Sequence, residues 1–341
     1  MLDHWVEVNI FEIILNLVAR LTNRVLLAEP DCYNKEWAES SMRYSESVTM
    51  TTMILKLFPL WLRPAIALVL PSARNVQTNL QRARKAMIPI INKRRQSETN
   101  DPNYQKPNDF LQWMMDAADS TEARPEKLAH RLLNMVLGSA HTTTMTGTHA
   151  MYDLCAMPEY IPALLDELTT LTSASGWDKT TPTRMWKMDS FLRESQRRNP
   201  ASLLGFHRIV RSPLTLSSGV YLPPSTHLCT ASYAISQDPS FAPNANDFDG
   251  FRYYRKRQQS AEDANKHQFA MTDKDHLHFG HGLHACPGRL LASIELKLIV
   301  GELIAGYDFK FPEGKGRPAT LNADEFLYPD PKARVLMRKQ D

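Results

Sequence analysis

The sequence contains little cysteine, and its cysteines are not paired. Four of them are scattered through 341 residues without a CxxC spacing: Cys32, Cys155, Cys229 and Cys286. This pattern excludes a disulfide framework and favours a reducing compartment. Net charge is also scarce, because 40 Lys and Arg residues stand against 37 Asp and Glu residues, for a net charge of +3. A chain so close to neutral is not one whose main surface binds nucleic acid.

Long uninterrupted apolar runs are lacking as well. The N-terminal segment is interrupted by Glu7, Glu12 and Arg20, and the spacing of its apolar residues predicts an amphipathic helix. A second apolar stretch, residues 58–71, is cut by Arg63 and by prolines at both ends. It is too short to cross a bilayer, although it could lie on a membrane surface. We therefore expect a chain that has no membrane anchor and is cytoplasmic or peripheral.

Periodic apolar residues indicate helices through the first two thirds of the chain and once more near its end. These patterns cover roughly residues 3–27, 72–95, 108–119, 125–155, 158–172, 185–198 and 287–304. Polar composition predicts loops at 94–109 and 172–183. Alternating runs predict a small hairpin sheet after Phe206 and short strands at 307–311 and 333–338. The predicted fold class is mainly α with a minor β part, in a single domain over residues 1–341.

The most informative segment is HLHFGHGLHACPGRLLASIELKLIV, residues 276–300. Cys286 follows two glycines and precedes Pro287, which is favoured at the first position of a helix. A cysteine close to a helix N-terminus is stabilised as a thiolate by unpaired backbone N–H groups and the helix dipole. Such a thiolate suits an axial ligand of heme iron. The plain alternative is a buried thiol that only packs in the core.

The order of residues around Cys286 resembles the heme-binding loop of the cytochrome P450 family. The pattern is Phe279-x-x-Gly282-x-x-x-Cys286-x-Gly288, within FGHGLHACPGRLLA. The resemblance implies that Cys286 is the proximal ligand of heme b (iron protoporphyrin IX) and that Phe279 packs beside it. It also implies that His284 faces a heme propionate and that the two glycines of the pattern, Gly282 and Gly288, shape the cofactor site.

A zinc site is a competing interpretation of the same segment. Histidines and the cysteine are dense here, at His276, His278, His281, His284 and Cys286. A zinc site, however, would not require the phenylalanine, the two glycines and the turn that follows the cysteine. We therefore prefer the heme interpretation.

Two upstream features support the resemblance. Glu194 and Arg197 are spaced i and i+3, so on a helix they share one face and can pair. The resemblance implies that Arg252 joins them in a buried triad that locks the heme-binding core without taking part in catalysis. Around Arg252 the sequence is GFRY, where the commoner version of the family has Pro-Glu-Arg-Phe. Many fungal members look like this sequence.

The pattern over 125–155 is similar to the family's long helix that crosses the heme. Its centre, LGSAHTTTMTG, holds glycines and threonines that are poor choices for a helix interior, and threonine hydroxyls can bond back to carbonyls. The plain alternative is that these residues allow close helix packing. The resemblance implies a locally broken turn, with Thr142 holding a water and relaying protons during O2 cleavage. His141 replaces the family's usual acid and would be a second proton relay.

Substrate contacts can be placed only by the same resemblance. It implies apolar pocket walls from Met135, Gly138 and Ser139, from the segment 201–206 and from the segment 325–327. The named candidates in the latter two are Leu203, Leu204 and Phe326. Each of these residues could equally belong to an ordinary core.

Family members usually begin with a membrane anchor, a small sheet and a helix whose Trp-x-x-x-Arg grips the heme propionates. No such motif precedes the first long helix here, since the tryptophans of this region are Trp5, Trp37 and Trp61. We therefore expect a family member that lacks its N-terminal third, with part of the propionate clamp absent.

The function that the resemblance implies is a heme-thiolate monooxygenase that uses O2 to oxidise a hydrophobic small molecule. Electrons would come from NADPH through a flavoprotein, NADPH–cytochrome P450 reductase, and the style of the sequence is typical of fungal secondary metabolism, including terpenoids. We expect a monomer with no nucleic-acid partner, and the family resemblance implies the endoplasmic reticulum membrane. The alternative is a truncated, catalytically inactive heme-binding relic.

Overall fold

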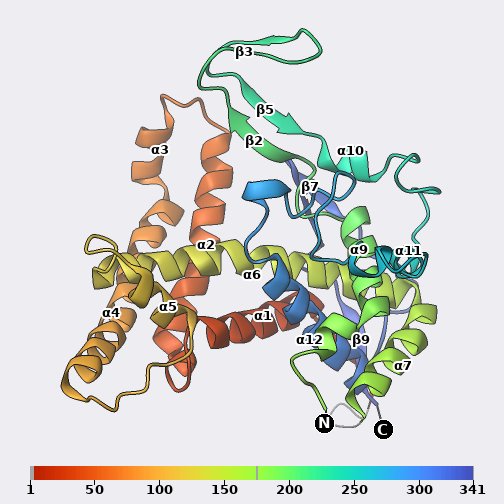
Figure 1. Ribbon diagram of the computed structural model, residues 1–341, viewed down its shortest axis with the longest axis horizontal. Coiled ribbons are helices and arrows are strands. Elements are labelled where there is room, and N and C mark those ends of the chain that lie inside the picture. Colours follow the sequence, from red (N-terminus) through yellow and green to blue (C-terminus); the bar gives the residue numbers. More distant parts are fainter. Residues whose placement is uncertain (1–3, 174–175, 341) are drawn as a thin grey trace. The chain divides into compact units, whose positions relative to one another are not determined.

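The computed structural model describes residues 4–173 and 176–340 (Figure 1). These residues divide into two compact units. The helical unit comprises residues 15–141, and the cysteine-loop unit comprises the described residues of 4–14 and 142–340. The expectation of a single domain over 1–341 stays a prediction.

The helical unit consists of helices packed through apolar faces. Its elements are α1 (Ile10–Leu26, from Leu15 on), the 3₁₀ turn η1 (Asp31–Tyr33), α2 (Lys35–Lys56), α3 (Arg63–Val69), α4 (Pro71–Asn100), α5 (Phe110–Ala117) and the first half of α6 (Pro125–Ala156). The Asn34 side chain caps α2 by accepting a hydrogen bond from the backbone N–H of Trp37. The ring of Trp37 is fully buried, and its Nε1 donates to Asn23 at 3.1 Å. The core of this unit therefore forms around α2, α4 and α6.

Three sequence expectations are wrong in this region. No helix is predicted over residues 28–71, whereas α2 and α3 lie there. The apolar stripe of α2 is weak, and its buried residues include small polar ones such as Ser40 and Ser45. Helix α4 continues to Asn100, so the predicted loop 94–109 begins too early. The physical reason is Arg94, whose charge looks like a loop residue but is buried in an ion pair.

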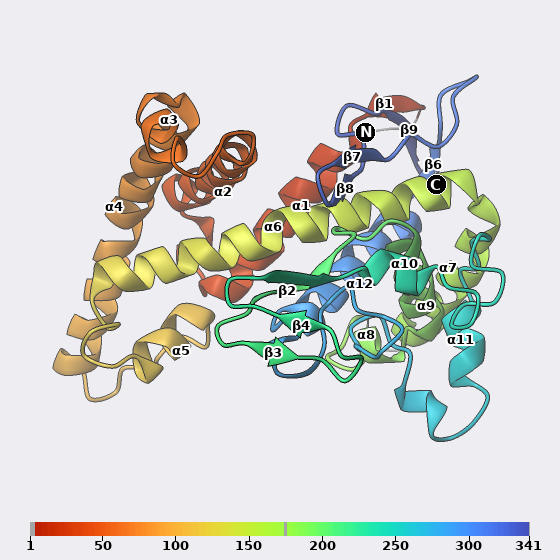
Figure 2. The ribbon, with the colours of Figure 1, turned by 90° about the horizontal axis from the view of Figure 1, so that it is seen from above.

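The cysteine-loop unit contains the remaining helices (Figure 2). They are the second half of α6, η2 (Pro158–Tyr160), α7 (Ile161–Thr172), α8 (Thr181–Arg184), α9 (Trp186–Arg198), α10 (Ser232–Ser236), α11 (Arg252–Arg257), η3 (Asp263–Asn265), η4 (Gly282–His284) and α12 (Arg289–Gly306). Helix α12 packs against α7, α8 and α9. Position 147 on α6 has to be small, because a Cβ at Gly147 would lie 3.0 Å from Leu296 of α12 and 3.1 Å from Ile14.

The strands of the described chain form one three-stranded and three two-stranded antiparallel sheets. The three-stranded sheet has the order β1-β9-β6, from β1 (Val6–Val8), β9 (Val335–Lys339) and β6 (Tyr307–Lys310). The pairs are β2 (Gly205–Ile209) with β5 (His227–Thr230), β3 (Leu214–Thr215) with β4 (Tyr221–Leu222), and β7 (Leu321–Ala323) with β8 (Phe326–Tyr328). The predicted helix from residue 3 is corrected here, since Val6 lies in a strand opposite Met337.

Most of the described elements are helices, and the strands are few and short. The predicted fold class, mainly α with a minor β part, is therefore confirmed. Within residues 4–173 and 176–340, every helix is too short or too polar to pass through a bilayer.

Candidate functional site

The loop before α12 folds tightly around Cys286. Its backbone N–H donates to the carbonyl of Phe279 at 2.7 Å, which closes the loop. Gly280 and Gly282 have φ values of +73° and +65°, a region that residues with a Cβ avoid. A Cβ at Gly280 would also lie 3.1 Å from the carbonyl oxygen of His284. Gly280 and Gly282 are therefore required by this path of the backbone.

Cys286 lies just ahead of α12, but not in its first turn. The helix begins at Arg289 with Gly288 as its N-cap, so the expectation that Pro287 is the first helical residue is wrong. The guanidinium of Arg289 donates to the carbonyl of Cys286 at 2.8 Å and holds the backbone of the cysteine from the helix side. The thiol is half-buried, and a Cβ at Gly288 would lie 4.0 Å from its sulfur.

The chemistry of these residues fits a heme group. One soft thiol donor is held by backbone contacts, and a glycine leaves room beside the sulfur. Leu290 and Ile294 follow at i and i+4 on α12 and expose apolar side chains, which suits a large apolar ring. Cys286 and Gly288 would hold the group, as the sequence predicts, and His284 is exposed on the same loop.

Phe279 packs against Phe269, with ring centroids 5.3 Å apart in an edge-to-face arrangement. Two histidines whose ring nitrogens are buried lie just upstream. Burial lowers the pKa of His278 to about 3 and holds the pKa of His276 well below its usual value, with nearby Arg193 acting in the same direction. Both imidazoles are therefore neutral near pH 7.

The zinc interpretation is not supported by these positions. His276 is fully buried, whereas His281 and His284 are exposed. In the described ranges, 4–173 and 176–340, no three His, Cys, Asp or Glu side chains are placed to share a metal ion.

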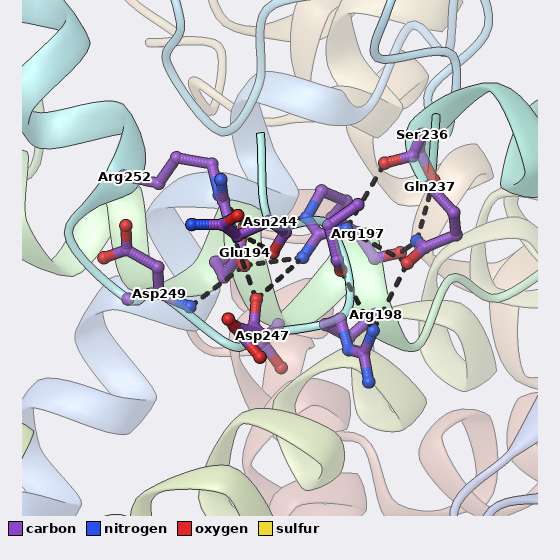
Figure 3. A network of polar contacts seen from close by, with 12 residues as sticks. Glu194, Arg197, Arg198, Ser236, Gln237, Asn244, Asp247, Asp249 and Arg252 are labelled. Carbon is purple, nitrogen blue, oxygen red and sulfur yellow. Dashed lines mark hydrogen bonds and ion pairs between the residues drawn. The ribbon is translucent and has the colours of Figure 1, made fainter. Parts of the chain in front are cut away.

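The predicted triad is brought together inside the cysteine-loop unit (Figure 3). The carboxylate of Glu194 accepts two hydrogen bonds from Arg197, at 2.7 and 2.8 Å, and two from Arg252, at 3.2 and 3.4 Å. All three side chains are buried. Glu194 also accepts from the backbone N–H of Asp249 at 3.0 Å.

The two arginines also bind backbone carbonyls in the loop before α11. Both donate to the carbonyl of Asp247, at 3.2 Å from Arg252 and 3.3 Å from Arg197, and Arg252 reaches the carbonyl of Pro243 at 2.5 Å. Arg197 also binds Gln237 at 3.0 Å. The triad therefore ties α9 to the whole segment between α10 and α11 (Figure 3).

The centre of α6 differs from the expectation. Helix α6 is continuous from Pro125 to Ala156, so the locally broken turn is not there. The hydroxyls of Thr146 and Thr148 bond back to carbonyls one turn earlier, at 2.9 and 2.8 Å, which satisfies them without breaking the helix. Close packing explains Gly147 but not Gly138, whose surroundings are open.

Thr142 and His141 are neighbours in sequence but have different surroundings. Thr142 belongs to the cysteine-loop unit and is exposed, whereas His141 is half-buried in the helical unit, and its Nε2 finds no hydrogen-bond partner among residues 4–173 and 176–340. Burial lowers the pKa of His141, and the charge of Glu46 opposes that shift only in part. Successive residues on a helix do not face the same way, so the structure does not bring the two relay candidates together.

The predicted pocket walls fall into two groups. Met135, Gly138 and Ser139 lie on α6 in the helical unit. The other candidates, Leu203, Leu204 and Phe326, belong to the cysteine-loop unit. Within that unit the segments 201–206 and 325–327 do lie side by side, because the backbone N–H of Leu203 donates to the carbonyl of Glu325 at 2.7 Å and Ser202 bridges to Phe326.

Sequence reasoning missed a second buried network on α9. Asp189 pairs with Lys297 of α12 and accepts from the backbone N–H of Phe269 at 2.8 Å. Phe269 is the ring that supports Phe279, so this network connects α9 to the cysteine loop. A lysine between apolar residues, in the run ELKLIV, is the feature that could have indicated it.

The fold is mainly helical, and a loop with two left-handed glycines holds a single cysteine ahead of a helix. These two features together are typical of heme-thiolate proteins. A family model, Cytochrome P450, matches residues 3–337. The chain belongs to the cytochrome P450 family, and the resemblance found in the sequence is confirmed.

The chain is 51% identical to cytochrome P450 monooxygenase AN1598 of Emericella nidulans over 341 residues, which are 99% of this chain and 64% of that protein. It is 47% identical to the monooxygenase olcJ of Penicillium canescens, covering 99% and 64%, and 45% identical to ent-kaurene oxidase P450-4 of Gibberella fujikuroi, covering 99% and 66%. The chain therefore spans about two thirds of the length of these relatives. Nothing in these relationships supports the inactive relic.

A solved structure of cyanobacterial CYP120A1 with retinoic acid bound matches the fold with a TM-score of 0.75. It is 18% identical, and the match covers 99% of this chain and 71% of that one. At this identity the likeness shows the fold alone.

Proposed function

We propose that this chain is the heme-thiolate part of a fungal monooxygenase that oxidises a hydrophobic small molecule of secondary metabolism. The observation that carries the proposal is the cysteine loop. Its hydrogen bond from Cys286 to Phe279 and its two left-handed glycines place a single thiol ahead of α12. Heme b, when bound there, supplies the activation of O2 and the transfer of one oxygen atom to a C–H bond, with the other leaving as water.

The residues of the chain hold and orient the group. Cys286 is the thiolate ligand, and its backbone is fixed from one side by Phe279 and from the other by Arg289. His284 supplies a hydrogen-bond donor for a propionate. The triad around Glu194 keeps the segments that flank the loop in place, so its role is structural.

The hydroxyl of Thr142 is the group that we assign to hold and pass protons on the substrate side. It is exposed, so it can exchange protons with a water molecule. His141 stays a second candidate relay by family resemblance, with a pKa that burial lowers.

The substrate class that we propose is terpenoid. The wall residues Leu203, Leu204 and Phe326 are apolar, which suits a hydrocarbon skeleton. One relative is named ent-kaurene oxidase, and ent-kaurene is such a skeleton. The partners that we propose are O2 and NADPH–cytochrome P450 reductase as the source of electrons, acting on a monomer.

We propose the cytoplasmic face of the endoplasmic reticulum membrane as the location. The surface over α3 and its flanks supports a peripheral contact, because Leu57, Trp61 and Leu68 are 80%, 79% and 77% exposed. Between Glu46 and Glu98 the chain has no acidic residue, so basic residues accompany this apolar surface. Apolar side chains among cations suit an anionic lipid surface.

The first test is the difference spectrum of the reduced, CO-bound chain after incubation with heme. We expect a strongly red-shifted Soret band that is lost in Cys286→Ala and kept in Cys229→Ala, which removes an exposed cysteine of β5. A Soret band without the red shift, or a red-shifted band that survives Cys286→Ala, would overturn the proposal.

A further inference from the structure

A side-chain contact lies directly beside the two wall segments of the cysteine-loop unit and adds to their backbone bonds. Nε2 of His207, on β2, lies 2.8 Å from a carboxylate oxygen of Glu325, beside the β7–β8 turn. On its other side, Nδ1 of His207 lies 3.2 Å from Nε2 of His227 on β5, and the two rings are stacked with centroids 5.2 Å apart. The imidazole of His207 is therefore held from both sides.

The backbone at this point is irregular. The register of β2 against β5 shifts between Gly205 and Arg208, which is a β-bulge at Phe206 and His207. Phe206 has a φ of +56°, and a residue with a bulky side chain adopts this conformation only where its surroundings hold it there. Bulges of this kind change the direction of neighbouring side chains. His207, with its two side-chain contacts, is one of the two residues of this bulge.

The bulge adjoins one wall of the proposed pocket. Leu203 and Leu204 come directly before it, and the amide of Leu203 is bonded to the carbonyl of Glu325 at 2.7 Å. The amide of Leu327 in turn donates to the carbonyl of Ala201 at 3.4 Å. The side chain of Glu325 is only 16% exposed and that of His207 is 39% exposed, so the pair lies at the edge of this wall with its imidazole facing water in part.

We propose that His207 and Glu325 are positioning residues that set the shape of the substrate pocket by fixing the segment 201–206 against the β7–β8 turn. Neither side chain touches the reacting atoms in this proposal. Nε2 of His207 lies against the carboxylate of Glu325, and Nδ1 is the atom that faces His227. The inference rests on the proposed function, since it assigns a role at the same pocket.

The first experiment measures amide hydrogen exchange in the full chain and needs no cofactor. We expect His207→Ala and Glu325→Gln to raise exchange about tenfold in peptides covering 200–207 and 321–328. His207→Gln keeps a donor near the position of Nε2 and should restore much of the protection. Glu262→Gln, which removes an exposed carboxylate paired with Lys266, is the matched control and should change nothing here. Unchanged exchange in both His207→Ala and Glu325→Gln would overturn the proposal.

The second experiment uses the heme-loaded chain and N-alkylimidazoles with short and long alkyl tails, whose binding is followed by the shift of the Soret band. If His207 shapes the wall, His207→Ala changes the ratio of the two dissociation constants several-fold while the short-tailed probe binds as before. An equal loss for both probes, or no change in the ratio, would contradict a role in specificity. A chain that binds no heme would refute the proposed function, whereas the exchange result would still decide whether the contact fixes the two segments.

Discussion

The two units each contain a buried arginine–carboxylate network, and the two networks have opposite arrangements. In the helical unit one guanidinium, that of Arg94, binds Asp109 in a fork at 2.7 and 2.8 Å and reaches Asp31 at 3.2 Å. In the cysteine-loop unit one carboxylate, that of Glu194, binds Arg197 and Arg252. The first network has a cation between two anions, and the second has an anion between two cations.

The difference lies in what remains when the central group is removed. If Arg94 is lost, water can solvate the partly exposed Asp31, and the buried Asp109 keeps two backbone N–H donors. Arg197 and Arg252 are both buried, so neither can turn to solvent if Glu194 is lost. Removing one partner of a buried pair is costly because the other charge stays buried without compensation. The network in the cysteine-loop unit should therefore be the more fragile of the two.

The largest effect is expected for Glu194→Gln. The change leaves two buried guanidiniums facing a neutral amide, so we expect the free energy of unfolding to fall by about 3–5 kcal/mol. Urea unfolding followed by circular dichroism measures this loss. The control is Glu262→Gln at the exposed Lys266 pair. A loss no greater than that of the control would show that the triad does not lock the core.

Asp109→Asn should have a smaller effect, of about 2–3 kcal/mol. The aspartate accepts from the backbone N–H groups of Gln112 and Ala28, at 2.8 and 2.6 Å, besides pairing with Arg94. An asparagine keeps one acceptor oxygen, and Arg94 keeps Asp31 as a partner. The same urea titration serves here, and a loss larger than that of Glu194→Gln would reverse the ranking of the two networks.

Arg252→Lys keeps the charge beside Glu194 but loses the fork that also binds the carbonyls of Pro243 and Asp247. We expect a loss of about 1–2 kcal/mol in the free energy of unfolding. Arg255→Lys changes an exposed arginine on the same helix and is the control. Equal stability of the two variants would mean that charge alone, without geometry, sustains the triad.

The smallest effect at neutral pH is expected for His278→Gln, which tests pH dependence. The pKa of His278 is about 3 in the folded chain, because of burial and then of Arg193 and Arg197, against an ordinary value of 6.5. The unfolded chain therefore binds a proton that the folded chain does not, and stability falls as the pH drops from 6.5 toward 3.

The variant lacks this proton uptake, so its stability should fall less steeply with acid. We expect proton uptake on unfolding to drop by about one proton around pH 5, as obtained from urea titrations at several pH values. His4→Gln, at an exposed position, should leave the slope as it is. If stability in His278→Gln falls with pH as steeply as in the wild type, this imidazole does not contribute to the loss of stability in acid.

The parts of the site that were predictable are those whose chemistry demands fixed residue types at short spacing. The cysteine loop needs its glycines for a left-handed backbone, and Glu194 needs Arg197 one helical turn away. Arg252 was placed only by the family resemblance. Partners distant in sequence could not be predicted, as with Asp189 and Lys297, because no local pattern records which helices meet.

Inference from composition is wrong where a charged side chain is buried, because polar residues then lie inside a helix and not in a loop. Arg94 falls in a polar stretch that reads as a loop, although tertiary contacts hold it inside α4. The contact of His207 with Glu325 is a further case, since both residues are ordinary surface types by sequence. The fold class was easier to predict than these contacts, because helical periodicity is a local property and pairing across the fold is not.

Gly250 stands two residues before Arg252 of the triad, where the commoner family version has proline. This glycine bears on which residues occur together in related sequences. The N–H of Gly250 donates to the hydroxyl of Tyr160 at 3.2 Å, a bond that a proline has no hydrogen to make. A Cβ at this position would lie 2.8 Å from the rings of Tyr160 and Phe191. Glycine at 250 and tyrosine at 160 should therefore covary among related chains, and lineages that carry the proline should have lost the tyrosine as well.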